Sequence, residues 1–267
     1  MTEQKTDTIR QSVRERYGKI AKNATSCCGP SLTSSCCGQS DPTGAIPSEQ
    51  VGYSKEQLAD LPEGADMGLG CGNPHAIGKI KPGETVLDLG SGGGIDCFLA
   101  ARAVGESGRV IGVDMTADMV SKARENAEKM GAANVEFRLG EIEHLPVSNG
   151  SVDVILSNCV VNLSPDKPQV FRDAFRVLKP GGRLAISDIV ALQAMPEEMR
   201  ADVGLLTGCV AGAAEVDELQ QMLVEAGFEY VSVNVEKRSR EAISEWFPGK
   251  KIEDYVTSAS IEAVKPA

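Results

Sequence analysis

The chain has 267 residues, with 27 Lys and Arg against 38 Asp and Glu, which gives a net charge of −11 at pH 7. This length suits one large α/β domain with a smaller appendage and excludes a small disulfide-stapled scaffold, because domains usually contain ~100–200 residues. The negative charge and the lack of a dense Lys/Arg run argue against a nucleic-acid binder, whose affinity depends on neutralising phosphates.

The N-terminal residues are charged from the third position and contain no apolar stretch of the kind found in signal peptides. No run of ~18 apolar residues occurs either, so we expect no membrane-spanning helix. We expect the protein to be cytoplasmic, and we also expect it to be a monomer. The eight cysteines are then expected as reduced thiols. Eight cysteines beside two histidines, His75 and His144, favour sulfur chemistry over imidazole chemistry.

Three regions are predicted along the chain. Residues 1–60 contain a docking helix, since apolar side chains recur at helical spacing over 9–24, and a cysteine-bearing loop rich in Gly, Pro and Ser. Residues 61–190 alternate short Val/Ile/Leu runs with amphipathic helices, which predicts parallel strands joined by right-handed crossovers in a doubly wound, Rossmann-like α/β sheet. Residues 191–267 form a smaller α+β region whose two late strands pair with each other or join the sheet edge.

Some helix boundaries can be predicted as well. The segment after the second strand predicts a helix from Thr116 to Met130, because Thr116 is a suitable N-cap and Gly131 can end the helix. In the last region, helices are expected around 196–207 and 215–226.

The first predicted strand ends in a glycine-rich turn, DLGSGGG at residues 88–94. Glycines let the backbone approach a ligand closely and adopt positive φ. A nicotinamide cofactor is disfavoured, because Ile95 stands where the G-x-G-x-x-G fingerprint requires glycine. Asp114, at the end of the second strand, can accept hydrogen bonds from ribose hydroxyls.

The ordered set of DLGSGGG, the VD at 113–114 and LKPGG at 178–182 resembles the class I S-adenosylmethionine methyltransferases. The resemblance implies that S-adenosylmethionine lies with its amino-acid end at the glycine turn, its ribose on Asp114 and its adenine near Met115 and residues 141–143. The alternative for Glu141 and Glu143 is that they are solvated loop charges. The expected cofactor-binding residues are Asp88, Gly90, Gly92, Gly94, Asp114, Met115, Glu141, Ile142, Glu143 and Asn158.

Three cysteines lie in loops that can converge on one sheet edge. Cys159 follows Asn158 at the end of the fourth predicted strand, where ligands bind in open α/β sheets. Cys71 lies between two glycines before the first strand, and Cys209 lies among small residues further downstream. Three such thiols predict a site for a soft ligand, whereas Cys97, within a helix among apolar residues, predicts a structural role.

The cysteine arrangement resembles that of the arsenite S-adenosylmethionine methyltransferases, with a cysteine in a GCG turn, one in an NCV segment and one further downstream. The resemblance extends from the YGKIA helix to ASIEAVKP. It implies that Cys71, Cys159 and Cys209 are the catalytic residues and bind trivalent arsenic as thiolates. The arsenic lone pair then attacks the sulfonium methyl group in line, without a general base. Arsenite and methylarsenite are the implied substrates, in arsenic detoxification, and antimonite and selenite stay open as soft substrates.

The resemblance also gives an N-terminal cysteine a role in arsenic capture or in a disulfide with the GCG cysteine, and spacing leaves open whether it is Cys27, Cys28, Cys36 or Cys37. A bridge between loop and core is favoured over one within a pair, because adjacent Cα atoms lie only ~3.8 Å apart. Zinc is disfavoured, because the pairs lack the C-x2-C knuckle. Disulfide formation is implied to reduce arsenic between methylations, with glutathione or thioredoxin as the external thiol reductant.

Two other functions fit the sequence. The first is a small-molecule C- or O-methyltransferase of the ubiquinone-biosynthesis type, for which the positions of the three thiols are coincidental. The second is a protein that sequesters soft metals, against which the intact glycine turn and Asp114 argue.

Overall fold

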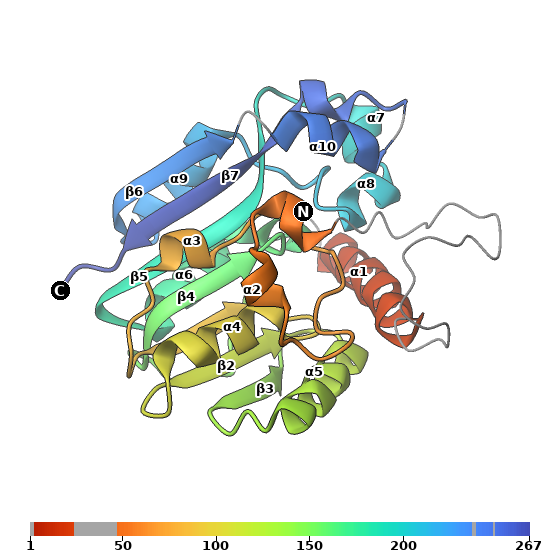
Figure 1. Ribbon diagram of the computed structural model, residues 1–267. Coiled ribbons are helices and arrows are strands. Elements are labelled where there is room, and N and C mark those ends of the chain that lie inside the picture. Colours follow the sequence, from red (N-terminus) through yellow and green to blue (C-terminus); the bar gives the residue numbers. More distant parts are fainter. Residues whose placement is uncertain (1–2, 24–46, 237–238, 248) are drawn as a thin grey trace.

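The computed structural model describes residues 3–23, 47–236, 239–247 and 249–267. The four loop cysteines considered for arsenic capture lie outside these ranges. A seven-stranded sheet in the order β3-β2-β1-β4-β5-β7-β6 forms the centre of the molecule (Figure 1). Its strands are β1 (Thr85–Leu89), β2 (Arg109–Asp114), β3 (Val135–Leu139), β4 (Val152–Asn158), β5 (Leu178–Ala191), β6 (Glu229–Glu236) and β7 (Val256–Val264).

Helices surround this sheet. The α-helices are α1 (Glu3–Asn23), α2 (Lys55–Leu58), α3 (His75–Gly78), α4 (Ile95–Val104), α5 (Ala117–Met130), α6 (Lys167–Val177), α7 (Glu197–Arg200), α8 (Val203–Thr207), α9 (Val216–Glu225) and α10 (Ser239–Trp246). Short 3-10 helices are η1 (Ser48–Val51), η2 (Val161–Leu163) and η3 (Ile252–Asp254). Within the described ranges, no helix combines the length and apolar character that crossing a membrane requires.

The strand pairing confirms the doubly wound sheet and specifies its edge. Strands β3, β2, β1, β4 and β5 run parallel, whereas β7 is antiparallel to both β5 and β6. The two late strands therefore pair with each other and also extend the sheet, so that the two alternatives left open by the sequence both hold.

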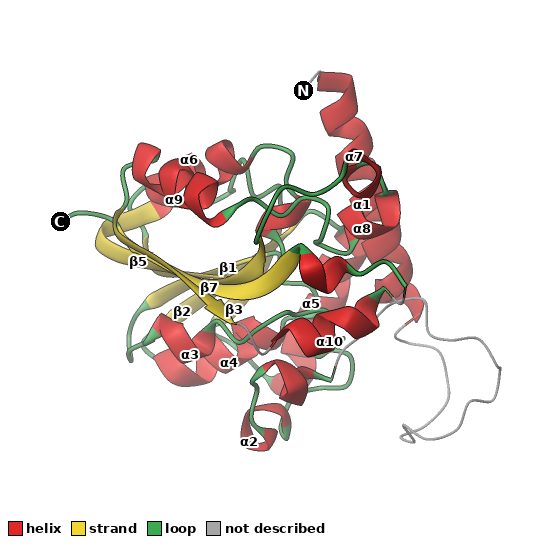
Figure 2. Ribbon diagram, turned by 90° about the horizontal axis from the view of Figure 1, so that it is seen from above, coloured by secondary structure: helices red, strands yellow, loops and turns green. Residues whose placement is uncertain are grey.

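The sheet is buried on both faces. On one face, α6 and α9 pack through side chains such as Phe171 and Leu223. On the other face, α4 and α5 pack through side chains such as Phe98 and Val120. Figure 2 shows the sheet edge-on between these helices, with α1, α7, α8 and α10 grouped beyond one end of the strands. The near-continuous apolar runs of the central strands follow from this double coverage.

The crossovers change faces between β1 and β4, which are neighbours in the sheet. The chain leaves β1 through a helix on one face and leaves β4 through a helix on the other. The carboxyl ends of these two strands therefore flank the topological switch point, where open α/β sheets bind ligands.

The predicted helix boundaries are confirmed for α5, which ends at Met130 before Gly131 in a left-handed conformation (φ 63°). The single helix expected over 196–207 is wrong. The side chain of Asp202 accepts a hydrogen bond from the backbone amide of Leu205 and begins a new helix, α8. The segment is therefore two short helices, α7 and α8.

Candidate active site

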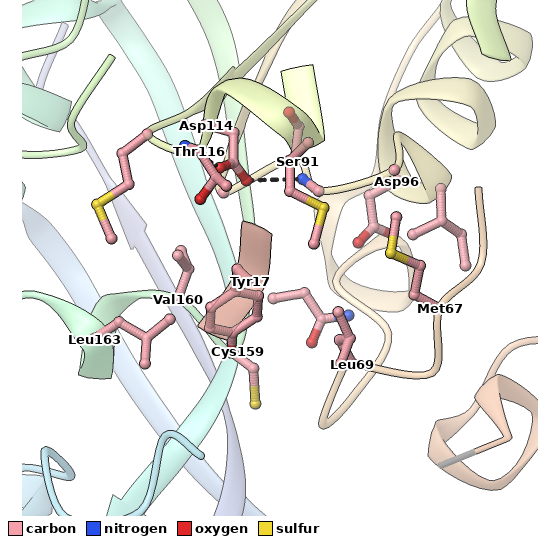
Figure 3. A pocket seen from close by; sticks show the side chains of 18 of the residues that line it. Tyr17, Met67, Leu69, Ser91, Asp96, Asp114, Thr116, Cys159, Val160 and Leu163 are labelled. Atoms are coloured by element: carbon pink, nitrogen blue, oxygen red, sulfur yellow. Dashed lines mark hydrogen bonds between the residues drawn. The ribbon is translucent and has the colours of Figure 1, made fainter. Parts of the chain in front are cut away.

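A cavity opens at the switch point and encloses about 1020 Å³ of space, including its open mouth. Its walls come from α1, the 48–70 segment, the glycine turn, the end of β2, residues 142–143 and residues 158–164. Figure 3 shows Ser91, Asp114 and Thr116 at one end of this pocket and Tyr17, Cys159 and Leu163 toward the other. A pocket in this position is typical of a small-molecule or cofactor site.

The glycine turn after β1 needs its glycines. Gly90, Gly92 and Gly94 all have positive φ, of 70°, 50° and 99°. A Cβ atom on Gly90 would lie 2.4 Å from a methyl carbon of Val160, so only glycine fits there. A Cβ on Gly92 would meet no protein atom within 4 Å, because this residue faces the cavity. The turn thus leaves a space against which a ligand can lie.

Asp114 closes the turn from the end of β2. One carboxylate oxygen accepts the backbone N–H of Gly92 (3.0 Å) and the other that of Thr116 (2.8 Å). Burial raises the pKa of Asp114, while these backbone hydrogen bonds oppose the rise. A carboxylate has about four acceptor positions, so acceptors remain for hydroxyl groups in the cavity.

Most of the residues that the sequence assigned to the cofactor line this cavity. They are Gly90, Gly92, Asp114, Met115, Ile142, Glu143 and Asn158. The other three, Asp88, Gly94 and Glu141, lie outside its lining. Asp88 is buried, and its carboxylate accepts a hydrogen bond from the Cys97 thiol (3.3 Å). Burial and the nearby Asp96 raise the pKa of Asp88, which lies in the interior and not in the lining of the cavity.

Glu143 is a buried carboxylate and not a solvated loop charge. Only 3% of the residue is exposed, and its Oε1 accepts hydrogen bonds from Arg10 (3.0 Å) and Ser164 (2.7 Å). Glu141 is more exposed and also pairs with Arg10, whose Nε lies 3.4 Å from it. The two acidic residues therefore fasten α1 over the cavity, both through Arg10 and Glu141 also through Arg14.

Cys71 and Cys159 form a disulfide across 88 residues of sequence, with their Cα atoms 5.8 Å apart. Cys71 is thus bonded to Cys159 and, in this state, not to a loop cysteine, while the role of a loop cysteine in arsenic capture stays a prediction because those residues lie outside the described ranges. Cys159 lines the cavity, so the bond lies beside the space available to a ligand. The carboxylate of Asp188 lies within 4.8 Å of both sulfur atoms.

Cys209 reaches the same region from the segment after α8. Its thiol donates to the backbone carbonyl of Cys159 (2.7 Å). Burial raises the pKa of this thiol well above its usual value, and the nearby Asp188 adds to the rise, whereas a hydrogen bond from Tyr17 opposes it. Burial likewise raises the pKa of Asp188 to about 6. The structure therefore brings Cys71, Cys159 and Cys209 together in their uncharged forms.

Two of these cysteines adopt a backbone conformation that non-glycine residues rarely adopt. Cys159 has φ 56° and Cys209 has φ 64°, both in the left-handed region. The amide of Cys159 donates to the carbonyl of Ser187 on β5 (2.8 Å), which helps hold this conformation. Such conformations cost of order 1–3 kcal/mol and tend to occur at functional sites.

Asn158 joins the cavity to the sulfur atoms. Its Oδ1 accepts the backbone N–H of Cys71 (3.0 Å), and its Nδ2 donates to the carbonyl of Gly72 (2.8 Å) and to the hydroxyl of Tyr53 (2.9 Å). The Tyr53 hydroxyl in turn donates to Asp96 (2.7 Å). One side chain at the end of β4 thus fixes the turn that carries Cys71.

Sequence reasoning missed several residues of the site. Arg10, Tyr17 and Tyr53 line the cavity, and Asn162 donates hydrogen bonds to Asp188 and to the carbonyl of Cys209. Tyr17 had a signal in the sequence, because it belongs to the apolar helical stripe over 9–24, which predicts a buried helix face. The sequence holds no comparable signal for Tyr53, which precedes a short helix in an irregular segment.

Comparison with known proteins agrees with this geometry. A family model described as a methyltransferase domain matches residues 80–227. An arsenite methyltransferase from Halobacterium salinarum is 55% identical over 98% of this chain and 68% of its own length. One from Aquipseudomonas alcaligenes is 40% identical over 82% of this chain and 62% of its own length. The chain thus spans about two thirds of these relatives.

A solved structure, of an arsenic(III) S-adenosylmethionine methyltransferase from Chlamydomonas reinhardtii, superposes with a TM-score of 0.62. It is 30% identical and covers 81% of this chain and 71% of its own. The fold and the pocket at its switch point define a class I S-adenosylmethionine-dependent methyltransferase. Within this class, the chain belongs to the arsenite methyltransferase family.

Proposed function

We propose that the chain transfers methyl groups from S-adenosylmethionine to trivalent arsenic held by Cys71, Cys159 and Cys209. The observation that carries this proposal is the convergence of the three sulfur positions beside the cavity, through one disulfide and one 2.7 Å hydrogen bond. Thiolates are soft ligands and suit a soft centre such as arsenic(III). The family membership supports the same substrate.

The disulfide form described here is the oxidised state of this site. Sulfur atoms bonded to each other have no thiolate to offer, so arsenite binding first requires two electrons and two protons from a reductant. Glutathione or a thioredoxin is the class of reductant we propose. Each of three thiols then replaces one hydroxyl of arsenite, and its proton leaves with that hydroxyl as water.

The walls of the cavity suit the cofactor. S-adenosylmethionine, when bound, supplies an electrophilic methyl group to the arsenic lone pair. Gly90 and Gly92 keep the turn open for its amino-acid end, and Asp114 retains acceptors for ribose hydroxyls. Ile142 and Glu143 also line the cavity and are the residues near which adenine is expected. Positioning is the main contribution of these residues, because the attacking lone pair needs no general base.

Methyl transfer removes one electron pair from arsenic and raises it formally to the pentavalent state. We propose that two thiolates return this pair by leaving as a disulfide. Cys71 and Cys159 suit that role, since their Cα atoms already lie at a disulfide distance of 5.8 Å. The external reductant then restores both thiols for another cycle.

The test is methyl transfer from labelled S-adenosylmethionine to arsenite with thioredoxin or glutathione, with separation of the arsenic products. We expect methylated arsenic from the wild type and at least a hundredfold less from Cys159→Ser and Cys209→Ser. Cys97→Ser is the matched control, because Cys97 is buried against Asp88 outside the cavity. Wild-type turnover in either site variant would contradict the thiolate site. Arsenite binding without a methylated product would indicate sequestration.

A further inference from the structure

A buried carboxylate lies beside the sulfur atoms of the proposed thiol site. Asp188, on β5, is only 2% exposed, and one of its carboxylate oxygens lies within 4.8 Å of the sulfur atoms of both Cys71 and Cys159. Neither the proposed methyl transfer nor the proposed disulfide step uses this group. Because burying a charge is costly, a carboxylate kept next to these sulfur atoms needs a physical account.

The surroundings of Asp188 stabilise its charged form. The backbone N–H groups of Val161 (3.0 Å) and Ile189 (2.8 Å) and the side-chain amide of Asn162 (2.9 Å) all donate to its oxygens. Such donors favour the charged form of a carboxyl group. Burial still raises the pKa of Asp188, but only to about 6, so the carboxylate carries its charge at pH 8. Lys167 also favours this charge, but within the described ranges it forms no ion pair with Asp188.

The cavity that Cys159 lines is acidic as well. The carboxylates among its described lining residues are Asp66, Asp96, Asp114 and Glu143. Arg10 is the one arginine or lysine of this lining, and it is paired with Glu143. Figure 3 shows Asp96 and Asp114 on the walls of the same pocket as Cys159. Charges of one sign on the walls of a cleft focus the electric field, so an anion is repelled from this cavity whereas a neutral molecule is not.

We propose that Asp188, together with the acidic cavity walls, makes the thiol site selective for uncharged hydroxides of trivalent elements and excludes oxyanions. The inference rests on the proposed function and deepens it by naming the substrate class. Arsenite is the uncharged As(OH)3 at neutral pH and antimonite is uncharged too, whereas selenite and arsenate are anions. Of the soft substrates that the sequence left open, antimonite is therefore admitted and selenite is not. Because Asp188 is shielded from water, its repulsion of an anion beside the sulfur atoms is only weakly screened.

The first measurement needs no variant. The reduced full chain is alkylated at pH 8 with iodoacetamide, which is neutral, or with iodoacetate, which is an anion of similar size. Mass spectrometry of tryptic peptides gives the rate at Cys159 alone, because its peptide contains no other cysteine. The ratio of the two rates is divided by that of free N-acetylcysteine amide. We expect this normalised ratio to favour iodoacetamide about tenfold or more, and to change less than about twofold between low salt and ~0.5 M salt.

The second measurement assigns the effect to Asp188. Asp188→Asn removes the charge at nearly constant size, and the matched control Asp217→Asn removes the same charge from an exposed position on α9. We expect Asp188→Asn to reduce the preference for iodoacetamide about tenfold and Asp217→Asn to leave it within about twofold. A thiol that becomes more reactive speeds up both reagents, so the ratio reports selectivity for charge. Binding of S-adenosylhomocysteine shows whether each variant is folded, because Asp188 lies outside the cavity lining.

Three results would overturn this inference while the proposed function stands. One is a wild-type ratio equal to that of the free thiol, and another is the absence of any reaction of Cys159 with iodoacetamide. The third is an unchanged preference in folded Asp188→Asn. If this variant does not fold, a wild-type preference that disappears at high salt overturns the role of the buried carboxylate. A wild type that prefers iodoacetamide but binds no arsenite overturns the proposed function and, with it, the substrate class.

Discussion

Replacing Arg10 by alanine is expected to destabilise the fold by about 2 kcal/mol and to weaken cofactor binding. The Arg10 side chain is 17% exposed and that of Glu143 is 4% exposed, with 3.0 Å between the charged atoms. At an effective dielectric constant of ~20, this separation corresponds to about 5.5 kcal/mol of attraction before desolvation. Breaking a fully buried pair costs about 3–5 kcal/mol, and the loss is smaller here because Glu143 keeps its hydrogen bond from Ser164.

Arg14→Ala is the matched control on the same helix. Arg14 is 42% exposed and lies 3.8 Å from Glu141, so its loss should cost less than about 0.5 kcal/mol. Urea denaturation followed by circular dichroism measures both variants, and calorimetry with S-adenosylhomocysteine measures the cavity. Equal losses of stability in the two variants would refute the argument, because burial of the Arg10 pair is its only basis.

Two further outcomes are expected. Gly92→Ala and Gly131→Ala should each lower the free energy of unfolding by about 1 kcal/mol, because both glycines have positive φ and a Cβ there would meet no atom within 4 Å. Only Gly92→Ala should also weaken cofactor binding, and equal affinities of the two variants by calorimetry would contradict this. Although partial burial raises the pKa of Asp173, hydrogen bonds from Arg176 and a backbone amide lower it on balance. The resulting stabilisation is complete above the ordinary carboxyl pKa of about 4 and is lost as the pH falls through the lower folded-state value. Urea midpoints should therefore show Asp173→Asn destabilised at pH 7 and closer to wild type at pH 3, and a constant difference would exclude this linkage.

The sheet and its helices could be predicted because their signals are local. Apolar runs define the strands. Helix α5 begins after Thr116, which occupies the N-cap position without a side-chain capping hydrogen bond, and it ends before Gly131 in the left-handed conformation. The division between α7 and α8 also had a local signal in Asp202, an N-cap residue within an otherwise helical pattern.

The disulfide could not be predicted from sequence, because it depends on where the loop before β1 packs. Cys71 and Cys159 are 88 residues apart, and the Cys71 turn is held near Cys159 by hydrogen bonds to Asn158 at the end of β4. The role of Tyr53 likewise could not be predicted from residue spacing, because its hydroxyl binds Asp96 and Asn158, which lie 43 and 105 residues away in the sequence. Long-range pairs of this kind are set by topology, and a single sequence records topology only through its crossovers.

The amide of Asn158 links the two sites that we propose, the cofactor wall and the thiol site. It lines the cavity and also holds the backbone on both sides of the Cys71 side chain, through Cys71 N and the Gly72 carbonyl. The next residue along the chain is Cys159, whose sulfur faces Cys71. In-line transfer requires donor and acceptor at a fixed separation, and a small misplacement has a large cost in rate. Because Asn158 belongs to both proposed sites, its short side chain fixes the separation of donor and acceptor. A movement of the cofactor wall at Asn158 therefore also moves the sulfur atoms of Cys71 and Cys159.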